Sequence, residues 1–291
     1  MIKRLSPRHR ESLIGLLYAS LPLIGFSAFF TVPFGISIVR TFYSGAGGQR
    51  FVGFENYISI FQSEAFQLAF VNTMRFIGVG VPLILVFSFI ISVALQGKIR
   101  GKNTFRSLLV LPLIVPVASV ILVFSILFER SGIVNNLLIS LGLLPIDFLN
   151  SDHAFTVLII LYLWKNSGYN IILLMAGLSQ IPGDYYDAAK VDGAGKLRIT
   201  LFITLPMMVP ALFFTTVISI INSFKSFREA FALGGSYPHQ SIYMLQHFMN
   251  NNFYNLNYAR LSVASLITFI IIIALVSVMY ILRQKAGDHQ L

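Results

Sequence analysis

The sequence predicts an all-α integral membrane protein with about six transmembrane helices. Of its 291 residues, 56% are hydrophobic and only 11% are charged, whereas a soluble domain usually carries about 25% charged residues. The mean hydropathy is +0.78. Residues 13–39 contain no charged side chain, and this run is longer than the roughly 20 residues that a helix needs to cross a bilayer.

Six long apolar runs follow one another along the chain, and each is expected to form one membrane span. Because they follow one another closely, we expect a single transmembrane domain over residues 1–291 with a core at 69–282. The first run is too long for the apolar region of a signal peptide, about 7–15 residues, and has no small-residue cleavage site, so we expect an uncleaved span. The predicted spans are 13–39, 69–95, 107–128, 154–176, 205–224 and 261–282.

The positive charge is distributed unevenly between the connections. Thirteen of the 21 Lys and Arg residues lie in residues 1–12, 96–106, 178–203 and the tail after 282. Positively charged connections stay in the cytoplasm, so both termini are predicted to be cytoplasmic. The formal net charge of +10 is explained by this topology, and no nucleic-acid partner is expected. The absence of cysteine excludes disulfides and thiolate metal sites.

A polar connection between the fourth and fifth spans has the signals of a short helix. Pro182 and Asp184 suit the first turn of a helix, while Gly193 and Gly195 suit its end. The adjacent Ala188 and Ala189 would let another protein approach closely. The alternative is an ordinary amphipathic helix on the cytoplasmic surface.

This connection also carries a family resemblance. The segment Asp187-Ala-Ala-Lys-Val-Asp-Gly-Ala-Gly, followed by Ile203-Thr-Leu-Pro206, resembles the EAA coupling loop of ABC-importer permeases, with Asp187 in place of glutamate. Phe51-Val-Gly-Phe-Glu-Asn-Tyr, Leu111-Pro, Val115-Pro and Gly132-Ile-Val-Asn resemble segments of the maltose-type carbohydrate permeases. The resemblance extends over almost the whole chain.

The resemblance implies an importer of the bacterial cytoplasmic membrane. Its parts would be a second permease subunit, two cytoplasmic ATP-binding subunits and an extracytoplasmic solute-binding protein. ATP and Mg would be bound by the ATPase subunits, with no cofactor in this chain. The coupling loop, about residues 179–206, would dock on an ATPase subunit through Asp187, Ala188, Ala189, Asp192, Gly193, Leu205 and Pro206.

The sequence also indicates that this chain does not hydrolyse ATP. Gly195-Lys196 superficially matches a phosphate-binding loop, but the required first glycine is replaced by Lys190 and the Ser or Thr by Leu197. The energy for transport must therefore come from another chain, and no catalytic residue is predicted.

Polar residues repeat at positions i, i+3, i+4 and i+7 in the fourth and fifth spans, so each set lies on one helical face. Polar groups in hydrocarbon are costly and face protein or water. Tyrosines could stack on sugar rings, while Asn and Ser could bind sugar hydroxyls; the alternative is that Ser and Asn only hold helices together. The family uses these two helices to line its substrate cavity. The predicted substrate path is Tyr162, Lys165, Asn166, Tyr169, Ser219, Asn222, Ser223 and Ser226.

The charged residues near these faces do not decide whether the substrate is a neutral or an acidic saccharide. Lys165 and Lys225 could favour an acidic saccharide or a sugar phosphate such as a glycerol phosphate, or they could extend to the membrane interface. Glu229 is expected to pair with the adjacent Arg228 at the outer rim. His239 and His247 have no acid or thiol at ligand spacing, so no metal site is predicted.

Two other functions compete with the importer. An ion-coupled secondary transporter usually needs an intramembrane acid, and a membrane-embedded enzyme needs a convergent catalytic cluster; the sequence shows neither. The prediction is therefore a permease subunit that forms half of the translocation path for a saccharide, with an oligosaccharide as the expected substrate.

Overall fold

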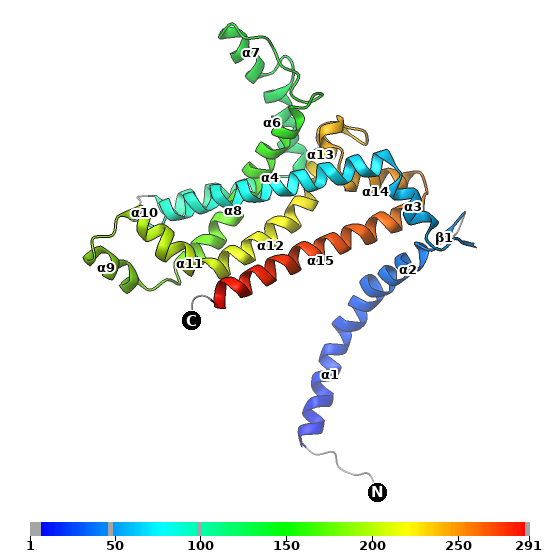
Figure 1. Ribbon diagram of the computed structural model, residues 1–291, viewed down its shortest axis with the longest axis horizontal. Helices are drawn as coiled ribbons and strands as arrows, with labels where there is room; N and C mark the ends of the chain where they lie inside the picture. The colour runs from blue at the N-terminus through cyan, green and yellow to red at the C-terminus, as the bar shows by residue number, and fades with distance from the viewer. Residues whose placement is uncertain (1–6, 46–48, 98–100, 289–291) are drawn as a thin grey trace. The chain divides into compact units, whose positions relative to one another are not determined.

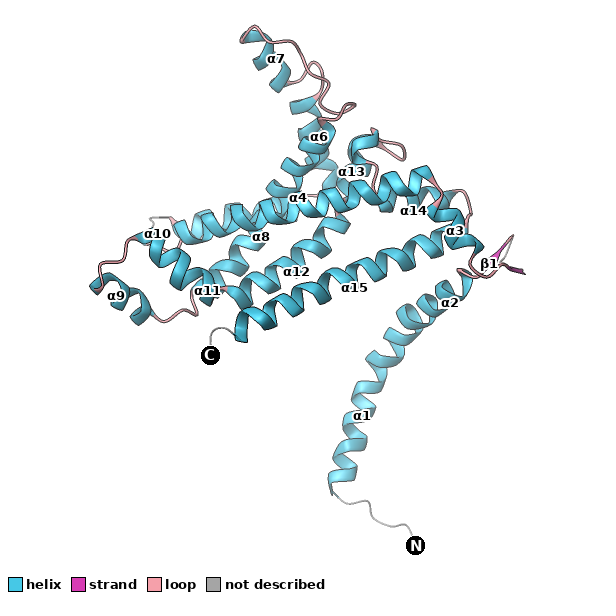
Figure 2. Ribbon diagram, viewed as in Figure 1, coloured by secondary structure: helices cyan, strands magenta, loops and turns pink. Residues whose placement is uncertain are grey.

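The computed structural model describes residues 7–45, 49–97 and 101–288, and these residues are predominantly helical (Figures 1 and 2). The described part has one short antiparallel ladder, in which β1 (Tyr43–Ser44) pairs with β2 (Arg50–Phe51). The basic residues Lys3, Arg4, Lys98 and Arg100, which count toward the predicted topology, lie outside the described residues.

The helices follow the order of the sequence. They are α1 (Pro7–Phe26), a π-helical turn (Ser27–Thr31), α2 (Val32–Arg40), α3 (Glu55–Phe61), α4 (Glu64–Ala94), α5 (Lys102–Ile114), α6 (Val117–Phe128), α7 (Ile133–Ser140), α8 (Ala154–Leu178), α9 (Gly183–Val191), α10 (Lys196–Ile199), a second π-helical turn (Thr200–Thr204), α11 (Leu205–Met207), α12 (Val209–Lys225), α13 (Phe227–Gly234), a 3-10 turn (Gln240–Ile242), α14 (Leu245–Tyr254) and α15 (Tyr258–Asp288).

Six helical segments in the described residues are long and apolar enough to cross a membrane, as predicted. They are Gly15–Arg40, Glu64–Ala94, Val117–Ser140, Ala154–Leu178, Val209–Gly234 and Tyr258–Gln284. Pro22 and Pro82 lie inside α1 and α4, consistent with the tolerance of membrane helices for proline.

The third predicted span, 107–128, is wrong as a single helix. The chain is extended at Val115, with ψ of 130°, and α6 begins only after Pro116. A proline disfavours the helical conformation of the residue before it and offers no N–H of its own. The preceding residues therefore form the separate helix α5, and the apolar span extends instead through α7.

The chain divides into two compact units, one of residues 1–62 and 252–267 and one of residues 63–251 and 268–291. In the first unit, the side chain of Asn56 donates to the carbonyl oxygens of Thr41 and Tyr43 at 2.8 and 3.0 Å. The hydroxyl of Tyr57 donates to Thr41 Oγ1 at 2.7 Å. These bonds attach α3 to the end of α2.

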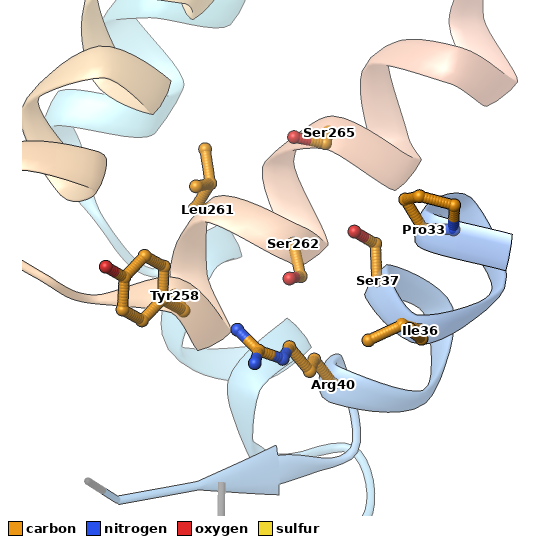
Figure 3. A pocket seen from close by; sticks show the side chains of 8 residues that line it. All are labelled: Pro33, Ile36, Ser37, Arg40, Tyr258, Leu261, Ser262 and Ser265. Atoms are coloured by element: carbon orange, nitrogen blue, oxygen red, sulfur yellow. The ribbon is translucent and has the colours of Figure 1, made fainter. Parts of the chain in front are cut away.

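The first unit also contains a groove of about 300 Å³ between the end of α2 and the start of α15 (Figure 3). The guanidinium of Arg40 lies 5.6 Å from the centre of the Tyr258 ring. Apolar residues and serines line the remaining walls: Pro33, Ile36, Ser37, Leu261, Ser262 and Ser265. The groove contains none of the predicted path residues.

In the second unit, α8 is the central helix and packs against α4, α5 and α12. Its core includes Phe76 of α4 and Tyr162 of α8, whose rings meet edge to face at 5.3 Å. Small residues allow close helix contact. A Cβ at Gly168 would lie 1.6 Å from the carbonyl oxygen of Leu109 in α5, and one at Gly177 would lie 2.5 Å from the Cβ of Ala211 in α12.

Candidate functional site

The two predicted polar faces meet between α8 and α12. The hydroxyl of Tyr162 donates to the carbonyl oxygen of Ser219 at 2.9 Å, and Asn170 Nδ2 donates to Ser219 Oγ at 2.8 Å. With Gly177 beside Ala211 near the other end, these contacts set an antiparallel register between the helices. Asn170 is a contact residue that the sequence analysis missed, although it follows Asn166 by one helical turn.

A polar pocket of about 250 Å³ opens where α5, α8, α12 and α13 meet. It contains four of the eight predicted path residues. Asn166 is buried and Asn222 is half-buried, so their amides belong to the walls of the pocket. The lining residues are Leu113, Lys165, Asn166, Asn222, Lys225, Ser226, Arg228 and Glu229.

The other four predicted residues do not line this pocket. Tyr162, Ser219 and Ser223 are buried, and the Ser223 hydroxyl donates to the carbonyl oxygen of Ile220 at 2.6 Å. Their hydrogen bonds join or stabilise helices, which is the alternative role considered for such residues. Tyr169 is half-buried.

Glu229 is placed differently from the prediction. Its carboxylate pairs with the ammonium of Lys165 on α8, not with Arg228. The side chain is buried, with Glu229 only 5% exposed, so the pair is not at an outer rim. The chain bends at Ser226 between α12 and α13, and this bend brings position 229 toward α8 while Arg228 stays exposed.

Lys165 lies near the middle of α8, and its ammonium turns toward Glu229 of α13. Its side chain is 15% exposed and is held by Glu229. The second carboxylate oxygen of Glu229 is buried without a hydrogen-bond partner among the described residues. Lys165 and Glu229 are 64 positions apart in the sequence, so helical periodicity could not predict that they pair. The one sequence signal for this site was an acidic residue within a run that is only weakly apolar.

The predicted short helix in the coupling loop is present as α9, which begins after Pro182. Its end forms a Schellman motif, because Gly193 N donates to Lys190 O and Ala194 N donates to Ala189 O, at 3.0 and 2.9 Å. Gly193 has a φ of +73°, a conformation that favours glycine. Gly195 has an ordinary φ of −73°.

The two alanines of α9 face different ways. Ala188 is exposed, whereas Ala189 is buried within this chain. Asp187 is exposed and pairs with Lys190 at 2.8 Å, and Asp192 is exposed at the C-cap. Leu205 and Pro206 belong to α11, which leads into α12.

The coupling loop also presents large apolar side chains to the surface. Tyr185 is 53% exposed and Val191 is 88% exposed. The hydroxyls of Tyr186 and Thr204 lie 3.4 Å apart and connect α9 to the start of the fifth span. The loop is therefore attached to the fifth span, and its outer surface combines apolar side chains with exposed charged ones.

Residues 69–287 match the family model described as the binding-protein-dependent transport system inner membrane component. The chain belongs to this family. The resemblance noted in the sequence is thus confirmed, and the protein is a multi-pass inner-membrane permease component and not an enzyme. Within the described residues, no group of three or more His, Cys, Asp or Glu side chains could hold a metal ion.

Similar proteins align over most of this chain. The lactose transport system permease protein LacF of Rhizobium radiobacter is 30% identical over 95% of this chain and 94% of its own length. The sn-glycerol-3-phosphate transport system permease protein UgpA of Yersinia pestis is 27% identical over 89% and 85%. A bacterial ABC transporter that imports the acidic polysaccharide alginate has the same fold, with a TM-score of 0.80, 23% identity and coverage of 96% and 99%.

Proposed function

We propose that this permease forms half of the translocation path of an ATP-driven importer, through which a saccharide delivered by an extracytoplasmic binding protein passes. The relatives named for lactose, for trehalose and maltose and for sn-glycerol-3-phosphate support a sugar or a sugar phosphate as the substrate. The observation that carries the proposal is the polar pocket between α8 and α12, inside the membrane-spanning part of the chain.

The chemistry of the pocket suits a sugar. Asn166 donates from Nδ2 to the carbonyl oxygen of Tyr162 at 3.0 Å, which leaves its Oδ1 as an acceptor for a hydroxyl. Asn222 can both donate and accept. Each such hydrogen bond contributes only about 0.5–1.5 kcal/mol, so a few of them bind a sugar weakly enough for release.

A second permease subunit would complete the path, and two cytoplasmic subunits would bind ATP and Mg and hydrolyse the nucleotide. A binding protein is part of the solved alginate transporter. The distribution of Lys and Arg supports cytoplasmic termini and a cytoplasmic coupling loop.

Docking of the coupling loop on an ATPase subunit is supported by its surface. Ala188 is small and exposed beside the apolar Tyr185 and Val191. Exposed apolar side chains of this kind are more stable when buried in a protein interface than in contact with water. The predicted docking residues are Asp187, Ala188, Ala189, Asp192, Gly193, Leu205 and Pro206; of these, Ala189 acts by packing within the loop because it is buried.

An ion-coupled secondary transporter is the rival function. Contrary to the sequence prediction, an acid does lie in a span, because Glu229 is inside Val209–Gly234. However, its carboxylate is neutralised by Lys165, and the family depends on a binding protein. Both observations favour the importer.

Uptake by cells that express the complete transporter tests the proposal, with radiolabelled lactose, maltotriose, a uronate trisaccharide and sn-glycerol 3-phosphate as probes. Asn166→Ala and Asn222→Ala should slow uptake of the accepted probe, because each removes hydrogen bonds in the pocket. Ser119→Ala, exposed on α6, is the control. Uptake that requires neither ATP nor the binding protein, or asparagine variants equal to the control, would contradict the proposal.

A further inference from the structure

The polar pocket carries an excess of positive charge. Four of its eight lining residues are charged, and Lys165, Lys225 and Arg228 outnumber Glu229. The structure shows two ion pairs within 4.0 Å among the described residues, Lys165–Glu229 and Lys190–Asp187. Lys225 and Arg228 therefore have no carboxylate partner within the described part of the chain.

The paired charges lie within the membrane-spanning helices, and Lys225 and Arg228 line the same pocket. Lys165 is near the middle of α8, about 17 Å from its start and about 20 Å from its end at 1.5 Å per residue. The bonds between Tyr162, Asn170 and Ser219 fix the register with α12, and the Lys165–Glu229 contact brings the start of α13 to the same level. Charges at this depth are costly unless they face a polar cavity and meet an opposite charge.

Glu229 can neutralise only one of the three cations. One of its oxygens binds Lys165, and the other is buried. Lys225 and Arg228 are exposed at the pocket, where their donors are available. A neutral sugar would leave both charges uncompensated, whereas anionic oxygens would match them.

We propose that the polar pocket selects a saccharide that carries an anionic group, a carboxylate or a phosphate. The anionic group binds Lys225 and Arg228, while Asn166 and Asn222 bind hydroxyls of the same molecule. A guanidinium binds two oxygens of a carboxylate or phosphate in parallel, and an ammonium adds a point charge. This inference rests on the proposed transport function and specifies its substrate class.

The test uses the complete transporter in proteoliposomes, with ATP and the binding protein supplied. The probes are maltotriose, a uronate trisaccharide of the same size and sn-glycerol 3-phosphate. The wild-type transporter should import at least one anionic probe about tenfold or more faster than maltotriose, and raised ionic strength should increase the KM for that probe.

Two variants test whether the preference for an anionic probe arises in the pocket. Lys225→Gln and Arg228→Gln should each raise the KM for the anionic probe by about tenfold, while Lys225→Arg, which keeps the charge, should retain most of the preference. Arg130→Gln is the control, since Arg130 is exposed outside the pocket. ATP hydrolysis stimulated by the loaded binding protein verifies that each variant folds and assembles.

Each outcome separates the two claims. Import of the uronate alone assigns a carboxylate, and import of sn-glycerol 3-phosphate alone assigns a phosphate; both support the inference. Import of maltotriose at least as fast, with both glutamine variants unchanged, overturns the anionic class but leaves saccharide transport intact. The absence of ATP-dependent import of all three probes and of lactose overturns the transport function itself.

Discussion

At the scale of single residues, His247 shows how a buried base links stability to pH. It is fully buried on α14, outside the predicted spans, and its Nδ1 accepts from the Met244 N–H at 3.1 Å. Phe227 meets its ring edge to face at 4.7 Å. Burial lowers the pKa of His247 to about 4, because the charged imidazolium loses its hydration.

This lowered pKa predicts acid sensitivity. The unfolded chain takes up a proton near the ordinary pKa of 6.5, whereas the folded protein resists protonation until about pH 4. Stability is therefore complete above pH 6.5 and decreases between pH 6.5 and 4, by about 1.4 kcal/mol per pKa unit of difference. His247→Asn, which can keep an acceptor for Met244, should reduce this loss in thermal unfolding at pH 7.5 and 4.5. Equal acid losses in both proteins would exclude His247 as the cause.

Gly193 gives a second residue-level prediction. Its φ of +73° is costly for a β-branched residue, so Gly193→Val should distort the end of α9 and impair ATP hydrolysis stimulated by the loaded binding protein. Gly195→Val is the matched control, because position 195 has an ordinary φ and open space where a Cβ would lie. If both variants hydrolyse ATP like the wild type, the conformation of Gly193 has no part in coupling.

The contacts of single residues were the part of the structure that the sequence predicted least well. Residue types and helical spacing predicted that Lys165, Asn166 and Asn222 lie on polar faces, and the structure brings them to one pocket. The partner of Glu229 was not predictable, because it depends on the bend at Ser226 and on contact with α8. Adjacent Arg228 offered the simpler pairing in sequence, yet the two side chains diverge on the short helix α13.

At the scale of elements, the packing of α5 on α8 depends on Gly168. A Cβ there would overlap the Leu109 carbonyl, which belongs to the backbone and cannot rotate away. Gly168→Ala should therefore separate the helices and destabilise the protein by about 1–3 kcal/mol. Thermal unfolding of the purified permease measures the effect.

Gly78→Ala provides the control for this prediction. Gly78 lies on α4, and a Cβ added there would meet no neighbouring atom, so alanine there should be neutral or stabilise the helix by up to about 1 kcal/mol. If Gly168→Ala is as stable as Gly78→Ala, the close approach of α5 and α8 is not required for folding.

Hydropathy predicted most of the membrane-spanning helices, because such helices need long apolar runs. It failed at the third span, where the apolar run continues across Pro116 but the helix does not. It also could not separate the pocket residues from Tyr162, Ser219 and Ser223, because one polar face of a helix can contact both a neighbouring helix and a cavity.

At the scale of the whole molecule, the charge distribution predicts the orientation in the membrane. This cysteine-free chain permits single cysteines at positions 101 and 193, predicted to be cytoplasmic, and at position 143, predicted to be external. An impermeant thiol reagent added to sealed cells should label only the cysteine at 143. External labelling at 101 or 193 would reverse the assigned orientation.

The pocket between α8 and α12 is proposed to be part of the transport path. Cysteines at positions 222 and 219 test it most directly, since Asn222 lines the pocket whereas Ser219, on the same helix, is buried against α8. The complete transporter in proteoliposomes would be labelled from each side, with and without ATP and vanadate. We predict that the cysteine at 222 changes the side from which it is labelled when nucleotide is trapped, while the cysteine at 219 reacts slowly in both states. Equal, slow labelling at both positions in both states would show that the pocket takes no part in transport.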